Sequence, residues 1–176
     1  MDERLRTAVI IGDPADGRTG GSIGKWFVDR AARRDDVVLD VLEPPEGVTS
    51  AMREFGTAID RAEGFVVVTP EYNRSFPAGL KQAIDAAYDE WLAKPVGFVS
   101  YGCRSRGHYA VEALRVVFTE LHVMAVRAEV AIDLTSLGAD GTPRDEDEVA
   151  VTTMMDQLTW WGFALRDARA TRPYLA

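Results

Sequence analysis

Short apolar runs alternate with longer segments of helical period along the chain. Five of these runs are rich in β-branched residues and mostly apolar, with little alternation of apolar and polar residues, at 7–11, 37–42, 64–69, 96–100 and 123–132. Strands buried on both faces have this composition, whereas a strand with one face in water alternates apolar and polar residues. The pattern therefore predicts five strands of a parallel sheet.

Segments with the spacing of amphipathic helices follow each run. Their apolar stripes span residues 23–31, 52–62, 80–91, 111–121 and 151–165, with apolar residues recurring at steps of three and four. A regular β–α alternation packs as a parallel sheet with helices on both faces, which is an α/β fold. These elements use nearly the whole length, so we expect residues 1–176 to form a single domain.

Composition narrows the classes of partner. The chain has 20 Lys+Arg against 28 Asp+Glu, which gives a net charge of −8. A negative surface repels phosphate backbones and anionic lipids, so neither a nucleic acid nor a membrane is an expected partner. No apolar stretch reaches the roughly 20 residues that span a bilayer, and acids follow Met1 where a signal peptide would carry only positive charge. We therefore expect a cytoplasmic protein.

The chain has few residues suited to a metal centre. It has one cysteine, Cys103, and two histidines, His108 and His122, too few for a multi-thiolate site and without metal-ligand spacing. No metal site and no Ser-His-Asp set is expected. His108 opens a predicted helix and either contacts a substrate or, since no paired acid is evident, is structural. His122 is expected to pack at the start of a buried strand.

Candidate chemistry follows the first strand. In a sheet of this kind, ligands bind beyond the carboxyl ends of the strands, where the strand order reverses. The glycine-rich loop at 12–22 offers a cation and two hydroxyls at a helix start, in Arg18, Thr19, Gly20 and Ser22. Helix N–H groups and the positive end of the dipole suit one terminal phosphate. The loop has neither the Walker nor the Gly-x-Gly-x-x-Gly pattern, and a plain surface loop with Ser22 as N-cap is the alternative.

Asp13 lies in the same loop and opposes a phosphate. A carboxylate about 5 Å from a phosphate, at an effective dielectric of about 20, costs roughly 3 kcal/mol per unit of phosphate charge. Arg18 could offset that cost. Alternatively, the Asp13 side chain turns inward and accepts hydrogen bonds from N–H groups of the loop.

The loop after the third strand is stiffened by Pro70 and Pro77. Pro70 fixes the backbone where the strand ends, and Pro77 suits the first turn of the next helix, with Ser75 as its cap. A stiff loop that carries Tyr72 and Asn73 can hold a planar heterocycle by stacking and hydrogen bonding. An ordinary turn is the alternative.

At this loop the chain resembles the NADPH-dependent FMN reductase family, which includes quinone, chromate and azo-compound reductases. The residues that carry the resemblance are Pro70-Glu71-Tyr72-Asn73, Ser75, Pro77, Leu80-Lys81 and Ala83-Ile84-Asp85. The resemblance implies a flavodoxin-like three-layer sandwich, with a five-stranded parallel sheet and helices on both faces. It also implies a bound FMN whose isoalloxazine ring lies against Pro70, Glu71, Tyr72 and Asn73, with Ser75 nearby.

The first loop matches the family in part. Gly12, Gly17 and Arg18 stand where the family has its glycines and an arginine. The family usually has a serine or threonine where this chain has Asp13, and often an arginine where it has Ala15. Both positions contact the phosphate in the family, so the two departures bear on the strength of FMN binding.

The segment after the fourth strand resembles the second flavin loop of the family, Tyr-Gly-Gly-x-Ser-Gly-Gly. The match implies a cofactor-binding position for four residues, Tyr101, Gly102, Cys103 and Ser105, with Cys103 and Arg106 in place of glycines. Cys103 is expected to fill space there, because cations lower a thiol pKa only when they point at it. Arg104 and Arg106 either attract the phosphates of a nicotinamide cofactor or are solvated.

The resemblance implies an FMN-dependent NAD(P)H oxidoreductase. The flavin would take hydride at N5 from NADPH or NADH and pass electrons to a small acceptor such as a quinone or free flavin. No catalytic side chain is then required, which agrees with the lack of an evident acid–base pair. Two alternatives remain: a pathway-specific flavin dehydrogenase or reductase in biosynthesis, and a flavodoxin-like binding module that has lost its flavin.

Aromatic residues stand out at two further places in the chain. Tyr88 and Trp91 stand at the end of the third predicted helix and offer more aromatic surface than one monomer face needs. The resemblance implies that this helix helps form a homodimer, alone or within a dimer of dimers. Trp160 and Trp161, in the last predicted helix, are expected to lie in the core.

Overall fold

Five strands and five helices alternate along the chain in a computed structural model that describes residues 3–13, 19–45, 47, 50–139 and 141–175. The strands are β1 (Leu5–Ile11), β2 (Val37–Leu42), β3 (Gly64–Pro70), β4 (Pro95–Gly102) and β5 (Met124–Asp133). The helices are α1 (Gly20–Ala31), α2 (Ser50–Arg61), α3 (Ala78–Asp85), α4 (His108–Glu120) and α5 (Asp145–Thr171), with a 3₁₀ turn at Asp89–Trp91. The predicted strands are confirmed to within a few residues.

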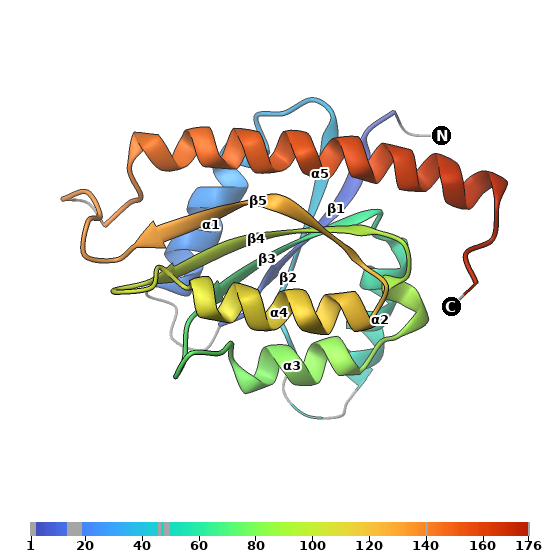
Figure 1. The fold of residues 1–176 in the computed structure, drawn as a ribbon, viewed down its shortest axis with the longest axis horizontal. Coiled ribbons are helices and arrows are strands. Elements are labelled where there is room, and N and C mark those ends of the chain that lie inside the picture. Colours follow the sequence, from blue (N-terminus) through green and yellow to red (C-terminus); the bar gives the residue numbers. More distant parts are fainter. Residues whose placement is uncertain (1–2, 14–18, 46, 48–49, 140, 176) are drawn as a thin grey trace.

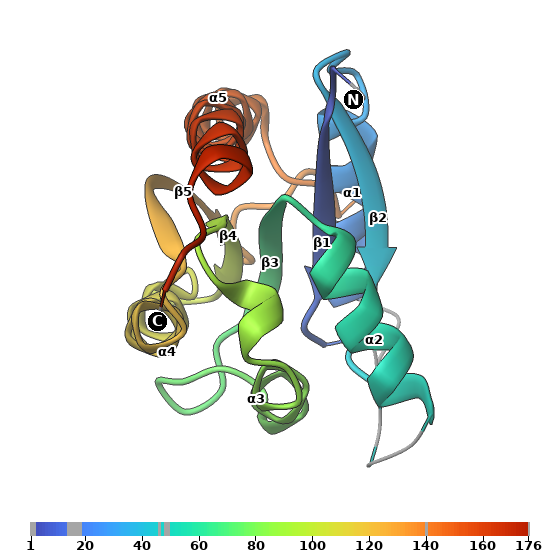
Figure 2. The same cartoon turned by 90° about the vertical axis from the view of Figure 1, so that its right-hand side faces the viewer.

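All four strand pairings are parallel, and the order across the sheet is β2-β1-β3-β4-β5. Helices α1 and α5 cover one face of the sheet, and α2, α3 and α4 cover the other (Figures 1 and 2). The predicted α/β class and flavodoxin-like three-layer architecture are confirmed. The strand order reverses between β1 and β3, because β1 pairs with β2 on one side and with β3 on the other.

The core has two halves, one on each face of the sheet. Ala8 and Ile10 of β1 face the cluster under α2, α3 and α4, whereas Val9 and Ile11 face the cluster under α1 and α5. Successive side chains of a strand point to opposite faces. A strand covered on both sides therefore needs apolar residues at every position, which explains the continuous runs.

The prediction of a surface role for Trp91 is wrong. Helix α3 ends at Asp85, and Trp91 lies in the 3₁₀ turn beyond it with no exposed surface. Its ring packs edge-on against Phe65 and Phe118, with centroids 4.7 and 5.5 Å apart. The indole N–H donates to the carbonyl of Ile84 at 3.1 Å, so both its apolar body and its polar atom are satisfied inside the fold.

Two further burial predictions are wrong. Trp160 is 64% exposed, because the inner face of α5 follows Leu158 and Gly162, and two residues correspond to about 200° around a helix. Trp161 is half-buried and touches the core. His122 is exposed, in a turn with φ of 54°, and its Nδ1 lies 2.9 Å from the Tyr174 hydroxyl.

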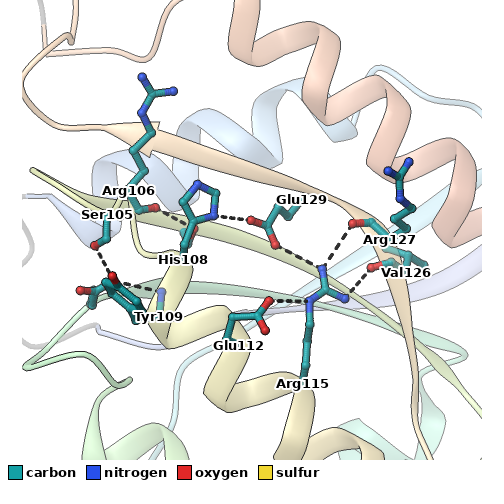
Figure 3. A network of polar contacts seen from close by, with 11 residues as sticks. Ser105, Arg106, His108, Tyr109, Glu112, Arg115, Val126, Arg127 and Glu129 are labelled. Carbon is teal, nitrogen blue, oxygen red and sulfur yellow. Dashed lines mark hydrogen bonds and ion pairs between the residues drawn. The ribbon is translucent and has the colours of Figure 1, made fainter.

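Strand β5 is one edge of the sheet, and side chains of α4 and α5 reach its backbone. Its pairing with β4 shifts, since Val96 is opposite Ala125 but Phe98 is opposite Glu129. In this bulged stretch, the Arg115 guanidinium of α4 donates to the Val126 carbonyl at 2.8 Å (Figure 3). Such contacts occupy polar groups that an open edge would offer to another strand.

Lys94 is a buried cation beside the amino end of β4, with only 7% of its surface exposed. Its Nζ donates to the carbonyls of Ile59 and Asp60, at 3.0 and 2.8 Å, where α2 ends. A helix leaves its last carbonyls without intrahelical partners. Burial, and then the nearby charge of Arg169, lower the pKa of Lys94 to about 8.

The stability of the fold should therefore rise with pH above about 8. Between the folded pKa of about 8 and the ordinary value of 10.5, the unfolded chain holds a proton that the folded chain has released, so the free energy of unfolding increases. Relative to a Lys94→Met variant, we expect an increase on the order of 3 kcal/mol in urea titrations across that interval. The contributions of other titrating groups cancel in this comparison. A difference in the free energy of unfolding between the two proteins that does not change with pH would contradict the lowered pKa of Lys94.

Candidate active site at the strand ends

The carboxyl ends of β1, β3 and β4 meet at one edge of the sheet, beside the reversal of strand order. Three loops leave from this edge, and they contain the residues predicted to bind a cofactor. Open α/β sheets bind ligands at this position. The structure thus brings together the described parts of all three predicted loops.

The β3–α3 loop contains a tight turn. The N–H of Tyr72 donates to the Ser75 carbonyl at 2.8 Å, and the N–H of Ser75 donates back at 3.0 Å. Asn73 and Arg74, between them, have φ of 51° and 66°, the left-handed pair of a type I′ turn. The predicted cap is wrong, because Pro77 is the N-cap of α3 and Ser75 is used in the turn.

Glu71 joins this loop to the next one. Its Oε2 accepts hydrogen bonds from the Ser105 hydroxyl at 2.5 Å and from the Tyr109 N–H at 3.2 Å. Tyr109 lies in the first turn of α4, whose N-cap is Gly107 and has no side chain to cap the helix. Glu71 therefore caps α4 from a different loop, and its negative charge also suits the positive end of the helix dipole.

The β4–α4 loop closes tightly on β4. Arg106 has φ of 53° and Gly107 has φ of 86°, so Arg106 occupies the left-handed backbone region that favours glycine. A Cβ at Gly107 would lie 2.5 Å from the Cβ of Ser100. The Ser100 hydroxyl donates to the Arg106 carbonyl at 2.8 Å. Cys103 is exposed in this loop.

Tyr101 carries a buried hydroxyl without a hydrogen-bond partner among the described residues. Its side chain is only 3% exposed. A Cβ at Gly20 would lie 2.6 Å from that hydroxyl and 2.7 Å from the Asp13 carbonyl, so the first turn of α1 touches both strand ends. Burial, and then the Asp13 charge, raise the pKa of Tyr101 well above its ordinary value. The hydroxyl therefore stays protonated and is a donor.

Helix α1 begins one residue after Thr19, its N-cap. Ser22 lies in the first turn, so the alternative in which Ser22 is the N-cap is wrong. Arg18 lies outside the described residues. Thr19, Gly20 and Ser22 thus stand at the helix end whose N–H groups lack intrahelical partners, as the phosphate interpretation requires.

Two side-chain pairs at the site were not predicted. The Arg74 guanidinium lies over the Tyr109 ring, 3.8 Å from its centroid. The one sequence feature that could have indicated a role for Tyr109 is its position directly after the β4–α4 loop. His108 does have a paired acid, contrary to the sequence argument. Its Nδ1 lies 2.5 Å from Oε1 of Glu129, whose other oxygen accepts from Arg115 at 3.2 Å (Figure 3).

No group of three or more His, Cys, Asp or Glu among the described residues is placed to hold a metal ion. Within the same part of the chain, no helix combines the length and the apolar character needed to cross a membrane.

Comparison with known proteins identifies the class. The model of the NADPH-dependent FMN reductase family matches residues 5–136, most of the chain. A quinone reductase of Pseudomonas putida is 31% identical over 132 residues, covering 70% of this chain and 69% of that protein. The chain belongs to the NADPH-dependent FMN reductase family.

Other relatives match over shorter stretches. A quinone reductase of Escherichia coli is 30% identical over 105 residues, covering 53% of each chain. An NAD(P)H-dependent FMN reductase of Schizosaccharomyces pombe is 45% identical over 64 residues, covering 36% of this chain and 32% of that protein. The chain spans between 30% and 59% of the length of four curated relatives that it matches.

Solved structures support the fold. A flavoenzyme NAD(P)H:(acceptor) oxidoreductase of Paracoccus denitrificans superposes with a TM-score of 0.73 at 20% identity, covering 91% of this chain and 98% of that one. A short-chain flavodoxin superposes with a TM-score of 0.60 at 17% identity, covering 90% and 98%. At these identities the likeness establishes the flavodoxin-like architecture.

The Glu71 cap should contribute measurably to stability. Replacing Glu71 with alanine removes the acceptor for one hydroxyl and one helix N–H, so we expect a loss of about 1–2 kcal/mol in the free energy of unfolding. Glu71→Gln should retain more than half of it. Glu112 is the control, because it is exposed on α4, the helix that Glu71 caps. Glu112→Ala should change the free energy of unfolding by less than about 0.5 kcal/mol. Equal losses in both alanine variants would contradict the cap.

Proposed function

We propose that the chain is an FMN-dependent NAD(P)H oxidoreductase that passes hydride or electrons through bound flavin to a small acceptor, such as a quinone or free flavin. Family membership supports the proposal, as do relatives named quinone reductase and NAD(P)H-dependent FMN reductase. The observation that carries it in this chain is the buried hydroxyl of Tyr101 near the reversal of strand order, which has no hydrogen-bond partner among the described residues. Such a donor costs free energy unless a ligand accepts its hydrogen bond.

The residues present fit the ring of a flavin. Tyr72 is 48% exposed and offers an aromatic face, Asn73 presents an amide at the tip of a rigid turn, and Tyr101 adds a hydroxyl donor. The proposed ring-binding residues are Pro70, Glu71, Tyr72, Asn73 and Ser75 on one loop, with Tyr101, Gly102, Cys103 and Ser105 on the other. Glu71 contributes by joining the two loops through Ser105.

The phosphate end of FMN fits less completely. Thr19, Gly20 and Ser22, with the first turn of α1, offer hydroxyl and backbone donors, and Arg18 is the proposed cation. The carboxylate of Asp13 lies in the same loop. Of the two arginines proposed for a nicotinamide phosphate, Arg106 has its Nε 3.7 Å from Asp133, so part of its charge is already balanced, which favours Arg104.

When bound, FMN would supply the redox chemistry, namely hydride transfer from NADPH or NADH and electron release to the acceptor. The role of the polypeptide would be to hold the ring through Tyr72 and Asn73 and to donate a hydrogen bond to it from Tyr101. At the described strand ends, the carboxylates of Asp13 and Glu71 already accept hydrogen bonds from Tyr72 and Ser105. Both carboxylates thus hold parts of the site together.

The visible spectrum tests this function. We expect purified protein mixed with FMN to show a perturbed flavin band, and NADPH or NADH to bleach that band without oxygen. If the protein is colourless as purified and its melting temperature does not change when FMN is added, the result would support a binding module that has lost its flavin. Bleaching followed by poor turnover with quinones and free flavin would instead support a pathway-specific reductase.

We further propose a homodimer and a cytoplasmic location. Tyr109 and Val116 are 43% and 72% exposed, and their spacing of seven residues places them on one face of α4, beside the candidate site. Trp160, exposed on α5 in the opposite layer, offers a second surface that a dimer of dimers would use. The exposed free thiol of Cys103 suits a reducing compartment.

Light scattering tests the oligomeric state. We expect the native chain to elute as a dimer and Val116→Glu to shift it toward monomer, because burying an unpaired charge at an interface is costly. Val149, 69% exposed on α5, gives the matched control Val149→Glu, which should leave the dimer intact. A monomeric native chain would reject the proposal.

A further inference from the structure

A hydrogen bond joins two of the loops at the candidate site. The Tyr72 hydroxyl, on the β3–α3 loop, donates to Oδ2 of Asp13, which follows β1, at 2.5 Å. A short bond from a hydroxyl to a carboxylate is of the stronger, charge-assisted kind. The bond spans β1 and β3, between which the strand order reverses.

The backbone around Asp13 is fixed on two sides. The preceding residue, Gly12, donates its N–H to the Val68 carbonyl of β3 at 2.7 Å. A Cβ at Gly20 would come within 2.7 Å of the Asp13 carbonyl, so Asp13 also touches the first turn of α1. Its side chain is held by Tyr72. The carboxylate thus has a defined position and cannot simply turn into solvent without losing the tyrosine hydroxyl.

A second observation marks this position as a ligand site. The Tyr101 hydroxyl is buried, has no partner among the described residues, and contacts the same glycine at the start of α1. The charge of Asp13 raises the pKa of that hydroxyl, so the two groups are within electrostatic reach. An unsatisfied donor, a helix start and a carboxylate therefore lie together at the strand ends, the place where open α/β sheets bind ligands in a crevice.

These groups act in opposite directions on an anion. The helix start favours negative charge, but Asp13 already supplies one there. A carboxylate about 5 Å from a phosphate, at an effective dielectric of about 20, weakens binding by about 100-fold or more for each unit of phosphate charge. An uncharged ligand that uses the same aromatic and hydroxyl groups is not penalised.

We propose that Asp13 is a specificity-determining residue of the flavin site, which the Tyr72 hydroxyl holds at the crevice so that it selects against the flavin phosphate. This inference rests on the proposed flavin-binding function. It means that the crevice binds riboflavin about as tightly as FMN. The phosphorylated flavin is then a ligand that exchanges with solution instead of a permanently held group.

Equilibrium titrations with FMN and riboflavin, followed by flavin fluorescence, test the proposal. In the native chain we expect dissociation constants for the two flavins within about tenfold of each other. Asp13→Asn keeps the size of the side chain and removes its charge, so it should tighten FMN binding by about 100-fold and change riboflavin binding by less than about threefold. Asp13→Ser gives a second, smaller uncharged residue and should act in the same direction.

The control separates local from overall charge. Asp29→Asn makes the same change in net charge further along α1, at an exposed carboxylate paired with Lys25, and should leave the ratio of the two dissociation constants unchanged. If both flavins bind the native chain but neither Asp13 variant changes the ratio, the proposal is overturned and the proposed function stands. If neither flavin binds any of the folded proteins, the proposed function itself fails.

Discussion

The reversal of strand order between β1 and β3 is the constraint on which the site depends. From β1 the chain passes to the face that α1 covers, and from β3 to the face that α3 covers (Figure 2), so the two connections diverge, and in open α/β sheets this is where a ligand crevice forms. Gly12 keeps the strand ends together, since a Cβ there would lie 3.0 Å from the Val68 carbonyl. The crevice therefore follows from topology and close backbone packing.

Two carboxylates at this edge have opposite consequences. Glu71 accepts from Ser105 and from the first turn of α4, so its charge is used to hold two loops in register. Asp13 accepts only one hydroxyl that the structure describes, and its charge acts on the Tyr101 hydroxyl, which lies beside the start of α1. The same functional group is structural in one loop and restricts the ligand in the other, because their donors differ in number and kind.

The fold could be predicted from the sequence because burial on both faces leaves a pattern that depends on local composition alone. Trp91 and Trp160 could not be placed in the same way. The helical spacing continues past Asp85 although the helix does not, and the pattern does not show which face of α5 meets the sheet until Gly162 packs on Leu5. The candidate site residues were predicted from their position in loops and from the resemblance, whereas the partners of Glu71 and Asp13 depend on how separate loops meet. The two partners are 34 positions apart along the chain in the first case and 59 in the second. Contacts over such separations leave no local signal in the sequence.

The Tyr101 hydroxyl shows how stability and binding are divided in this fold. A buried hydroxyl without a partner destabilises a protein by about 1–3 kcal/mol, and phenylalanine would fill the same volume without that loss. The cost is acceptable only if the hydroxyl is satisfied in the working state, by a ligand or by water that enters with it. The other residues of β4 from Pro95 to Ser100 are all buried, so the surrounding sheet can sustain this local cost. A strand that contributes its interior residues to the core and its last aromatic residue to the crevice thus joins the hydrophobic core directly to the site.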